Sequence, residues 1–342
     1  MKRCLQLAKN GLGKTYPNPL VGSVIVYKDK IIGEGWHQKA GEAHAEVNAI
    51  QSVKDASLLK KATLFVNLEP CSHYGKTPPC SDLIIQKGIR KVVVGTLDPN
   101  PQVAGRGISR MIQAGIEVHV GCLEDECNEI NKRFFTYFKK KRPYIILKWA
   151  QTKDGYIAPK QQDFGKPFWI TNLDSKQLVH KWRAEEQSIL VGKNTAIKDN
   201  PKLNTRLWEG KNPVRVLIDS KLETMQQPEK LHLLDGSIKT LIFCGKTSEN
   251  RENLIFERID FNHRVPEQIL DILYRHKLQS LIIEGGKRTL QEFIDSGLWD
   301  EARVFTGTGY LKFGIEAPAL NAVPIKSTFI GQDTLNLYKN EH

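Results

Sequence analysis

Long apolar runs are absent from this chain of 342 residues. A helix needs about 20 consecutive apolar residues to span a bilayer, so we expect no membrane partner. The N-terminal residues 1–9 are basic but contain neither a long apolar core nor a cleavage site, so they predict no signal peptide. The expected location is therefore cytoplasmic.

Cysteine is also scarce, with six in the whole chain. A disulfide framework needs a denser set of cysteines than this. Four of the six are expected to be small core residues or free thiols: Cys4, Cys122, Cys127 and Cys244. The other two, Cys71 and Cys80, belong to a different pattern that is treated below.

The glycine-rich fingerprint of Rossmann domains, Gly-x-Gly-x-x-Gly after a strand, is absent as well. There are no internal repeats and no low-complexity segments. A chain of this length usually forms two domains, and a basic run at residues 139–142 followed by Pro143 marks a plausible boundary. We expect one domain over residues 1–142 and a second over residues 143–342.

Strand-like and helix-like segments alternate in both predicted domains, which is typical of the α/β class. In the first domain we expect strands at residues 23–27, 31–37, 63–68, 91–95 and 117–120 and helices at 4–13, 44–53 and 107–114. A further helix is expected to have Thr77 as its N-cap and Pro78 as its first residue. In the second we expect strands at residues 144–149, 188–192, 214–219, 241–244, 280–283 and 302–306, with helices at 174–185 and 266–276 and from 288.

Positive charge is concentrated in the first predicted domain. The net charge of the chain is +12, and residues 1–142 carry 22 basic against 13 acidic residues, whereas the remainder carries 28 against 25. A basic domain suits nucleic acid or a small phosphorylated substrate, but it also suits plain solubility. Charge alone does not separate these three interpretations.

His44, Cys71 and Cys80 together offer one imidazole and two thiols. Three such ligands leave the fourth position of a tetrahedral zinc open for water. Cys80 lies at a predicted helix start, where the partial positive charge favours thiolate. The alternative is a closed structural zinc site in which His37 or His73 is the fourth ligand.

Glu46 follows His44 by two residues and is predicted to carry protons rather than bind the metal. Zinc held by two thiolates and a neutral imidazole has a formal charge of zero, so it acidifies its water weakly and a nearby base becomes valuable. Glu46 would take the proton of the water, pass it to a ring nitrogen and then protonate departing ammonia. This is the pattern of the zinc deaminases. The eight residues between the cysteines, in place of the two usual in nucleoside and nucleic-acid deaminases, predict a loop that shapes the substrate pocket.

Four segments closely resemble the bifunctional riboflavin-biosynthesis deaminase/reductase family: Pro17-Asn18-Pro19-x-Val21-Gly22, His37-Gln38-x-Ala40-Gly41-Glu42-x-His44-Ala45-Glu46, Glu69-Pro70-Cys71-Ser72-His73-x-Gly75-Lys76-Thr77-Pro78-Pro79-Cys80 and Asp98-Pro99-Asn100-Pro101-x-Val103-x-Gly105-x-Gly107. The resemblance implies an N-terminal cytidine-deaminase-like three-layer α/β/α domain with one Zn²⁺. It also implies a C-terminal dihydrofolate-reductase-like α/β domain that uses NADPH. Measured against this family, the first helix is expected to be shortened.

The resemblance also implies a substrate and the residues that hold it. The deaminase would act on 2,5-diamino-6-ribosylamino-4(3H)-pyrimidinone 5′-phosphate, and the reductase would then convert the ribosyl group to a ribityl chain. In the first domain Asn18, His37 and Lys76 would hold the pyrimidine or its phosphoribosyl arm. In the second domain the implied substrate contacts are Arg183, Leu203, Arg206 and Glu284, and Lys148 and Glu284 would assist proton movement.

Two glycines, Gly285 and Gly286, separate a predicted strand from a predicted helix. Backbone N–H groups there could cradle a pyrophosphate, and the resemblance implies that this loop binds NADPH. The cofactor site would then comprise Ala150, Trp169, Thr195, Asp199, Ser220, Gly286, Lys287, Arg288 and Thr289. Thr152 stands where the family commonly has serine, and it retains the hydroxyl.

Three other functions are compatible with parts of the sequence. A nucleic-acid (tRNA-type) base deaminase with an accessory α/β domain would explain the basic first half, but the eight-residue spacing and the second domain argue against it. A structural zinc module fused to a nucleotide-binding regulatory domain would make Glu46 dispensable. A protein with only the first domain active would not oxidise NADPH. We expect a small-molecule substrate and no nucleic acid, and the sequence is compatible with a homo-oligomer.

Overall fold

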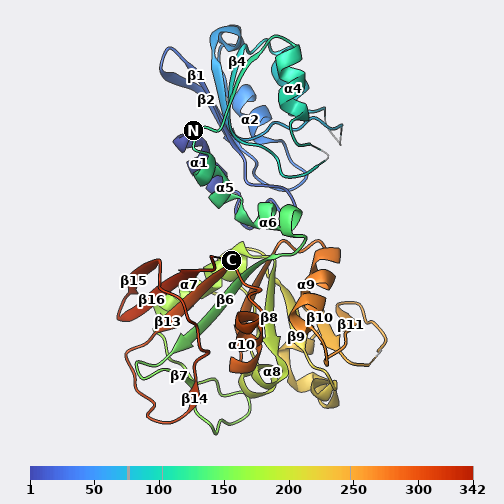
Figure 1. The fold of residues 1–342 in the computed structure, drawn as a ribbon, viewed down its shortest axis with the longest axis vertical. Helices are drawn as coiled ribbons and strands as arrows, with labels where there is room; N and C mark the ends of the chain where they lie inside the picture. Colours follow the sequence, from blue (N-terminus) through green and yellow to red (C-terminus); the bar gives the residue numbers. More distant parts are fainter. Residues whose placement is uncertain (75–77, 102, 247, 342) are drawn as a thin grey trace. The chain divides into compact units, whose positions relative to one another are not determined.

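The computed structural model describes residues 1–74, 78–101, 103–246 and 248–341 (Figure 1). Contacts divide the chain into two compact units, Met1–Lys141 and Arg142–His342. Each unit has its own sheet and its own apolar cores. Among the described residues, no helix combines the length and apolar character needed to cross a membrane.

The first unit alternates strands and helices. Its elements are α1 (Lys2–Lys9), β1 (Gly22–Tyr27), β2 (Lys30–Trp36), α2 (Ala45–Gln51), β3 (Thr63–Leu68), α3 (Cys80–Gln86), β4 (Lys91–Thr96), α4 (Arg106–Gln113), β5 (Glu117–Val120), α5 (Glu124–Ile130) and α6 (Lys132–Lys140), with a 3₁₀ turn over Ala56–Lys61. The strands form one sheet in the order β2-β1-β3-β4-β5. β1 is antiparallel to β2 and β3, and β3, β4 and β5 are parallel.

The sheet of the first unit is covered on both faces because residues of β1 alternate in direction. Ile25 packs with apolar residues of α2, α3 and α4, whereas Val24 packs with Cys4 and Leu7 of α1. Successive side chains of a strand point to opposite faces, so a strand with two apolar faces requires a layer on each side. The predicted three-layer α/β/α arrangement is confirmed.

The second unit contains a larger sheet. Its principal elements are β6 (Tyr144–Gln151), β7 (Tyr156–Ala158), α7 (Leu173–Glu185), β8 (Ser188–Gly192), α8 (Lys193–Asp199), β9 (Val214–Ile218), β10 (Thr240–Cys244), β11 (Leu254–Arg258), α9 (Val265–Arg275), β12 (Ser280–Gly285), α10 (Lys287–Asp295), β13 (Glu301–Thr306), β14 (Ile315–Glu316), β15 (Lys326–Ile330) and β16 (Asp333–Lys339). Nine of these strands form a sheet in the order β11-β10-β9-β8-β12-β6-β13-β16-β15.

Neighbouring strands from β11 to β13 in this order are parallel. β16 pairs antiparallel with β13, and β15 pairs antiparallel with β16. β12 lies between β8 and β6, with Ile283 opposite Leu147. The next residues along these two strands, Glu284 and Lys148, therefore lie near each other in the carboxyl-terminal halves of β12 and β6. Open α/β sheets bind ligands in the crevice outside the carboxyl ends of their strands.

Two predicted helix boundaries are wrong. The helix expected to begin at Pro78 begins at Cys80, and Pro79 is its N-cap with extended backbone; the proposed N-cap Thr77 lies outside the described residues. The reason is steric, because a residue that precedes proline disfavours the helical region and Pro78 precedes Pro79. The first helix covers Lys2–Lys9 rather than residues 4–13, and turns follow it.

Candidate active sites

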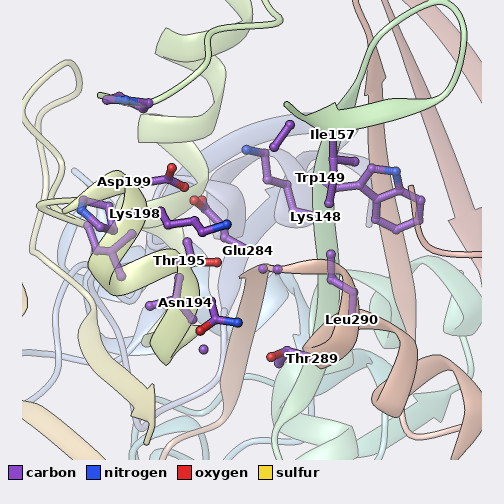
Figure 2. Close-up of a pocket in the computed structure, with 18 of the residues that line it drawn as sticks. Lys148, Trp149, Ile157, Asn194, Thr195, Lys198, Asp199, Glu284, Thr289 and Leu290 are labelled. Carbon is purple, nitrogen blue, oxygen red and sulfur yellow. The ribbon is translucent and has the colours of Figure 1, made fainter. Parts of the chain in front are cut away.

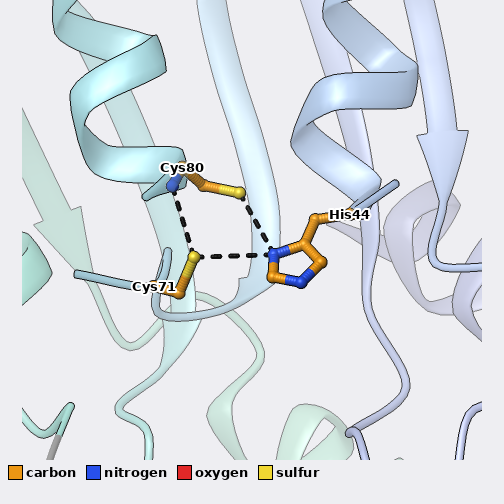
Figure 3. A group of neighbouring side chains, drawn as sticks. All are labelled: His44, Cys71 and Cys80. Carbon is orange, nitrogen blue, oxygen red and sulfur yellow. Dashed lines mark hydrogen bonds between the residues drawn. The ribbon is translucent and has the colours of Figure 1, made fainter. Parts of the chain in front are cut away.

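His44, Cys71 and Cys80 come together in the first unit, as their spacing predicts (Figure 3). Their ligand atoms all lie within 4.8 Å of one another. His44 is the N-cap of α2, Cys80 is the first residue of α3, and Cys71 lies in the loop after β3. His44 Nδ1 is 3.5 Å from Cys71 Sγ and 3.3 Å from Cys80 Sγ.

The two thiols ionise unequally. The pKa of Cys71 falls to about 4 because it accepts a hydrogen bond from Cys80 and lies beside His44, whereas the pKa of Cys80 rises well above its ordinary value beside Cys71. The backbone N–H of Cys80 also donates to Cys71 Sγ over 3.2 Å. Without a metal ion the first negative charge thus falls on Cys71, and a thiolate at Cys80 in a zinc-bound site stays a prediction. Two sulfurs and one imidazole nitrogen remain a donor set that fits Zn²⁺.

Glu46 lies in the first turn of α2 and only 3% of its surface is exposed. Burial, and then the charge of Cys71, raise the pKa of Glu46 to about 7. A carboxyl group with that pKa can both accept and donate a proton near neutral pH. Within the described part of the chain, no fourth histidine, cysteine or carboxylate joins the three ligands, so neither His37 nor His73 closes the site.

Asn18 and His37 form a pair beside this cluster. Asn18 Nδ2 lies 3.0 Å from His37 Nε2, and His37 Nδ1 lies 3.1 Å from the carbonyl oxygen of Ala43. A carbonyl only accepts, so Nδ1 carries the proton and Nε2 accepts from the amide of Asn18. Burial lowers the pKa of His37, which keeps this ring neutral. Lys76, the third residue expected here, lies outside the described residues.

A cavity of about 870 Å³ opens in the second unit (Figure 2). Every second-domain residue that the sequence implicated lines it: Lys148, Ala150, Trp169, Arg183, Thr195, Asp199, Leu203, Arg206, Ser220, Glu284, Gly286, Lys287, Arg288 and Thr289. These residues come from β6, α7, α8, β12 and α10 and from the loops between elements. A volume of this size suits a cofactor-sized ligand.

Three buried charges form the centre of this cavity. Arg183 donates to the two carboxylate oxygens of Glu284 from Nε over 3.2 Å and from Nη2 over 2.7 Å. Burial alone would raise the pKa of Glu284, but Arg183 and Lys148 outweigh it and lower the pKa from 4.5 to about 2. Burial lowers the pKa of Lys148, although Glu284 opposes this shift. Lys148 can therefore release its proton more readily than an exposed lysine.

The glycine pair Gly285–Gly286, where β12 meets α10, lies close to Thr195. A Cβ on Gly286 would lie 3.3 Å from Thr195 Oγ1, and a Cβ on Gly285, whose φ is 144°, would lie 3.6 Å from the same atom. Bare backbone therefore lies at the cavity wall, directly before the N-terminus of α10. Such backbone N–H groups suit a pyrophosphate, so the residues present fit NADPH.

The cavity also contains residues that the sequence analysis missed. His180, Phe168 and Asn194 line it. His180 precedes Arg183 by three residues on α7, and residues at that spacing share one face of a helix; this spacing was the available signal. Phe168 and Asn194 offered none, because cavity-lining loops follow no periodic pattern.

Two family models match the chain. The model described as RibD C-terminal domain matches residues 143–310, and the cytidine and deoxycytidylate deaminase zinc-binding region matches residues 1–96. The chain is 40% identical to riboflavin biosynthesis protein RibD of Aquifex aeolicus, covering 99% of this chain and 97% of the relative, and 40% identical to that of Synechocystis, covering 98% and 94%.

Solved structures agree with these matches. The diaminohydroxyphosphoribosylaminopyrimidine deaminase/5-amino-6-(5-phosphoribosylamino)uracil reductase of Thermotoga maritima has a TM-score of 0.89 at 37% identity, covering 99% of this chain and 97% of that one. RibD of Acinetobacter baumannii has a TM-score of 0.85 at 30% identity, covering 100% and 98%.

These relatives match both units, which confirms the predicted α/β folds and does not favour the nucleic-acid deaminase alternative. The zinc-binding deaminase region and the reductase domain imply Zn²⁺ and NADPH as cofactors. The chain belongs to the RibD family of bifunctional riboflavin biosynthesis enzymes, which join a zinc-dependent deaminase to an NADPH-dependent reductase.

Proposed function

We propose that residues 1–142 deaminate 2,5-diamino-6-ribosylamino-4(3H)-pyrimidinone 5′-phosphate and that residues 143–342 then reduce its ribosyl group to a ribityl chain. The relative from Thermotoga maritima is named for a deaminase and a reductase of this kind. The observation that supports the proposal most is that one chain holds a His-Cys-Cys cluster beside a buried glutamate and also a cavity lined by every implicated reductase residue.

In the deaminase site, His44, Cys71 and Cys80 would hold zinc, which when bound supplies an activated water. Glu46 moves the protons: it takes one from the water and passes it to the pyrimidine nitrogen. It then carries the remaining proton of the added hydroxyl group to the amino group, which leaves as ammonia. Its raised pKa suits both directions of transfer near neutral pH. Asn18, held by His37, orients the pyrimidine.

In the reductase site, the glycine pair and the start of α10 would hold NADPH, which when bound supplies a hydride. Arg206 binds the substrate phosphate, and Arg183, which is engaged with Glu284, lines the same cavity. Lys148 donates the proton that the imine nitrogen gains as its carbon is reduced. Glu284 holds Arg183 over 2.7 Å and keeps negative charge beside Lys148, so it positions both cations.

The decisive experiment is zinc analysis combined with an ammonia and NADPH-oxidation assay on the pyrimidine substrate. Glu46→Gln should retain one zinc per chain and lose ammonia release at least 100-fold, because the proton carrier is gone. The same variant should still oxidise NADPH when given the deaminated substrate. Glu117→Gln, an exposed carboxylate of the same unit, is the matched control and should behave as wild type.

Intact ammonia release in Glu46→Gln would rule out this mechanism, whereas a wild-type protein that binds zinc and releases no ammonia would favour a structural zinc module. Rapid mixing of NADPH with the deaminated substrate tests the second half, because absence of oxidation would leave only the first unit active. The cytoplasmic location and the homo-oligomer stay predictions, to be tested by cell fractionation and by light scattering.

A further inference from the structure

Glu69 is a buried carboxylate, 4% exposed, directly after β3. It accepts hydrogen bonds from four backbone N–H groups of residues 98–108. Oε2 accepts from Asp98 over 3.3 Å and from Gly105 over 2.9 Å, and Oε1 accepts from Gly107 over 3.1 Å and from Ile108 over 3.4 Å. One side chain thus fastens Asp98 at one end of this segment and the first turn of α4 at the other.

The same segment also rests directly on the backbone that follows Glu69. A Cβ on Gly107 would lie 2.2 Å from the carbonyl oxygen of Pro70, so only glycine allows this approach. Gly105 has a φ of 74°, in the left-handed region that favours glycine. These contacts account for the two glycines of the segment Asp98-Pro99-Asn100-Pro101-x-Val103-x-Gly105-x-Gly107, to which the proposed chemistry gives no role.

Cys71 is the one proposed zinc ligand that lies in neither a helix nor a helix cap. His44 is fixed as the N-cap of α2 and Cys80 as the first residue of α3, but residues 69–72 form no regular structure. The backbone N–H of Glu69 donates to the carbonyl of Thr96 over 3.0 Å, which ties the start of this loop to β4. The Glu69 carboxylate and the Gly107–Pro70 contact hold the middle of the loop. The start of α3 holds its end, because the backbone N–H of Ser81 donates to the carbonyl of Cys71 over 3.2 Å.

We propose that Glu69 is a positioning residue for the zinc ligand Cys71, acting by clamping residues 98–108 against the Glu69-Pro70-Cys71 turn. The inference rests on the proposed function of His44, Cys71 and Cys80 as zinc ligands. Groups that orient metal ligands without touching the metal commonly change metal affinity by about 10–100-fold when they are removed. Glu69 therefore controls how long zinc stays bound rather than the chemistry of deamination itself.

The test is Glu69→Gln in the full chain. A carboxamide has a single acceptor oxygen, so its NH₂ group would face N–H donors and the clamp would open on one side. Zinc release to a chelator, followed with a colorimetric dye, should accelerate about 10–100-fold. Ammonia release should decline in step with the zinc content and recover when zinc is added in excess. NADPH oxidation with the deaminated substrate should not change.

Thr96→Val is the control for a purely structural effect. The carbonyl of Thr96 in β4 accepts from the backbone N–H of Glu69, and valine keeps that backbone bond. The Oγ1 of Thr96 donates to Asn128 Oδ1 of α5 over 2.9 Å, so Thr96→Val loses only this side-chain bond and leaves the contacts of the Glu69 carboxylate unchanged. Thr96→Val should lower the melting temperature and retain zinc at the wild-type rate. The proposal is overturned if Glu69→Gln holds zinc as firmly as wild type, or if Thr96→Val loses it equally fast.

Gly105→Ala provides a milder variant in case Glu69→Gln does not fold. No atom lies within 4 Å of the added Cβ, so only the positive φ is strained, and zinc release should accelerate by a smaller factor. Unchanged release in this variant would count against the clamp. Wild-type protein that binds no zinc, or Cys71→Ser that retains it, would contradict the proposed zinc site itself, and the two failures are therefore distinguishable.

Discussion

At the scale of single residues, the two arginines of the reductase cavity have different partners. Arg183 uses Nε and Nη2 on Glu284, and its Nη1 donates to the carbonyl of Asn204 over 3.4 Å. Arg206 is exposed and donates from Nη1 to Asn204 Oδ1 over 2.9 Å. Arg206 is therefore the guanidinium more available to a substrate phosphate, although both arginines were expected to contact it.

Arg206→Ala should raise the KM of the reductase for its phosphorylated substrate about 10–100-fold, because a charge-assisted contact worth about 1.5–3 kcal/mol is lost. Its kcat should change little, and ammonia release should not change. Steady-state kinetics with Arg264→Ala, an exposed arginine that does not line the cavity, provide the comparison. An unchanged KM would remove Arg206 from the phosphate site.

The ion pair of Glu284 predicts how stability depends on pH. Its pKa is lowered from 4.5 to about 2 in the folded state, so the unfolded chain binds the proton more tightly. The stabilisation is fully present above about pH 5 and is lost as the pH falls toward 2, with a total on the order of 3 kcal/mol. Urea unfolding of wild type and Glu284→Gln between pH 6 and 3 checks this, because the variant should show the shallower decline.

At the scale of elements, the backbone of β1 approaches the backbone of α1 directly at Gly22. A Cβ on Gly22 would lie 2.1 Å from the carbonyl oxygen of Cys4 and 3.0 Å from the backbone nitrogen of Ala8. Backbone atoms of a helix cannot rotate away, so the helix itself would have to move. Gly22 thereby fixes the distance between one outer layer and the sheet.

Gly22→Ala should destabilise the first unit by about 3 kcal/mol, at the upper end of what overpacking costs. Thermal and urea unfolding, with ammonia release as the probe of the folded first unit, would measure the loss of stability. Gly309→Ala is a control substitution, because no atom lies within 4 Å of its added Cβ and it should leave stability close to wild type. Equal stability of the two variants would contradict the packing described here.

The elements that the sequence predicted are those with a dense apolar core pattern and clear turn signals. β3 and β8 are found at the predicted bounds because buried runs end at glycine, proline or charge. α5 was missed because its sequence, EDECNEI, has no apolar stripe. β15 was missed because most of its residues are exposed. β16 was missed because only two of its seven residues are buried, although Gly331 in the turn between the two strands was a usable signal.

The two candidate sites differ in how far sequence could predict them. The His-Cys-Cys cluster was predictable because few residue types bind zinc and these lie close together in the chain. The reductase cavity was predictable only through family resemblance, since its lining residues range from Lys148 to Ile315 with no local spacing. The clamp of Glu69 was not predictable at all, because its partners are backbone N–H groups.

At the scale of the whole molecule, two units with separate cores carry two activities of one pathway. The relatives match almost the whole chain, so the fusion is a property of the family. The first predicted domain carries most of the net charge and the second is almost balanced, with 28 basic against 25 acidic residues. Overall charge would therefore suggest that only the first unit attracts anions.

The lining of the reductase cavity is positively charged, although the net charge of the second unit is small. Its lining holds nine lysines and arginines against three aspartates and glutamates, so a nearly neutral unit presents one strongly positive concavity. Such a surface draws phosphorylated ligands toward it by long-range attraction, and dissolved ions weaken that attraction beyond about 10 Å at 0.1 M salt. The Arg183–Glu284 pair, with side chains 11% and 9% exposed, is shielded from those ions.

A change in ionic strength should thus affect ligand binding, measured by KM, and leave the hydride-transfer step, measured by kcat, nearly unchanged. Raising sodium chloride from about 0.05 to 0.5 M should increase the KM for NADPH and for the pyrimidine several-fold while kcat stays nearly constant. Steady-state assays across that range measure both quantities, and a kcat that falls as steeply as the affinity would refute the separation. At low sodium chloride the charge of the cavity would keep the KM for both ligands low. At high sodium chloride the same reduction step would need higher ligand concentrations.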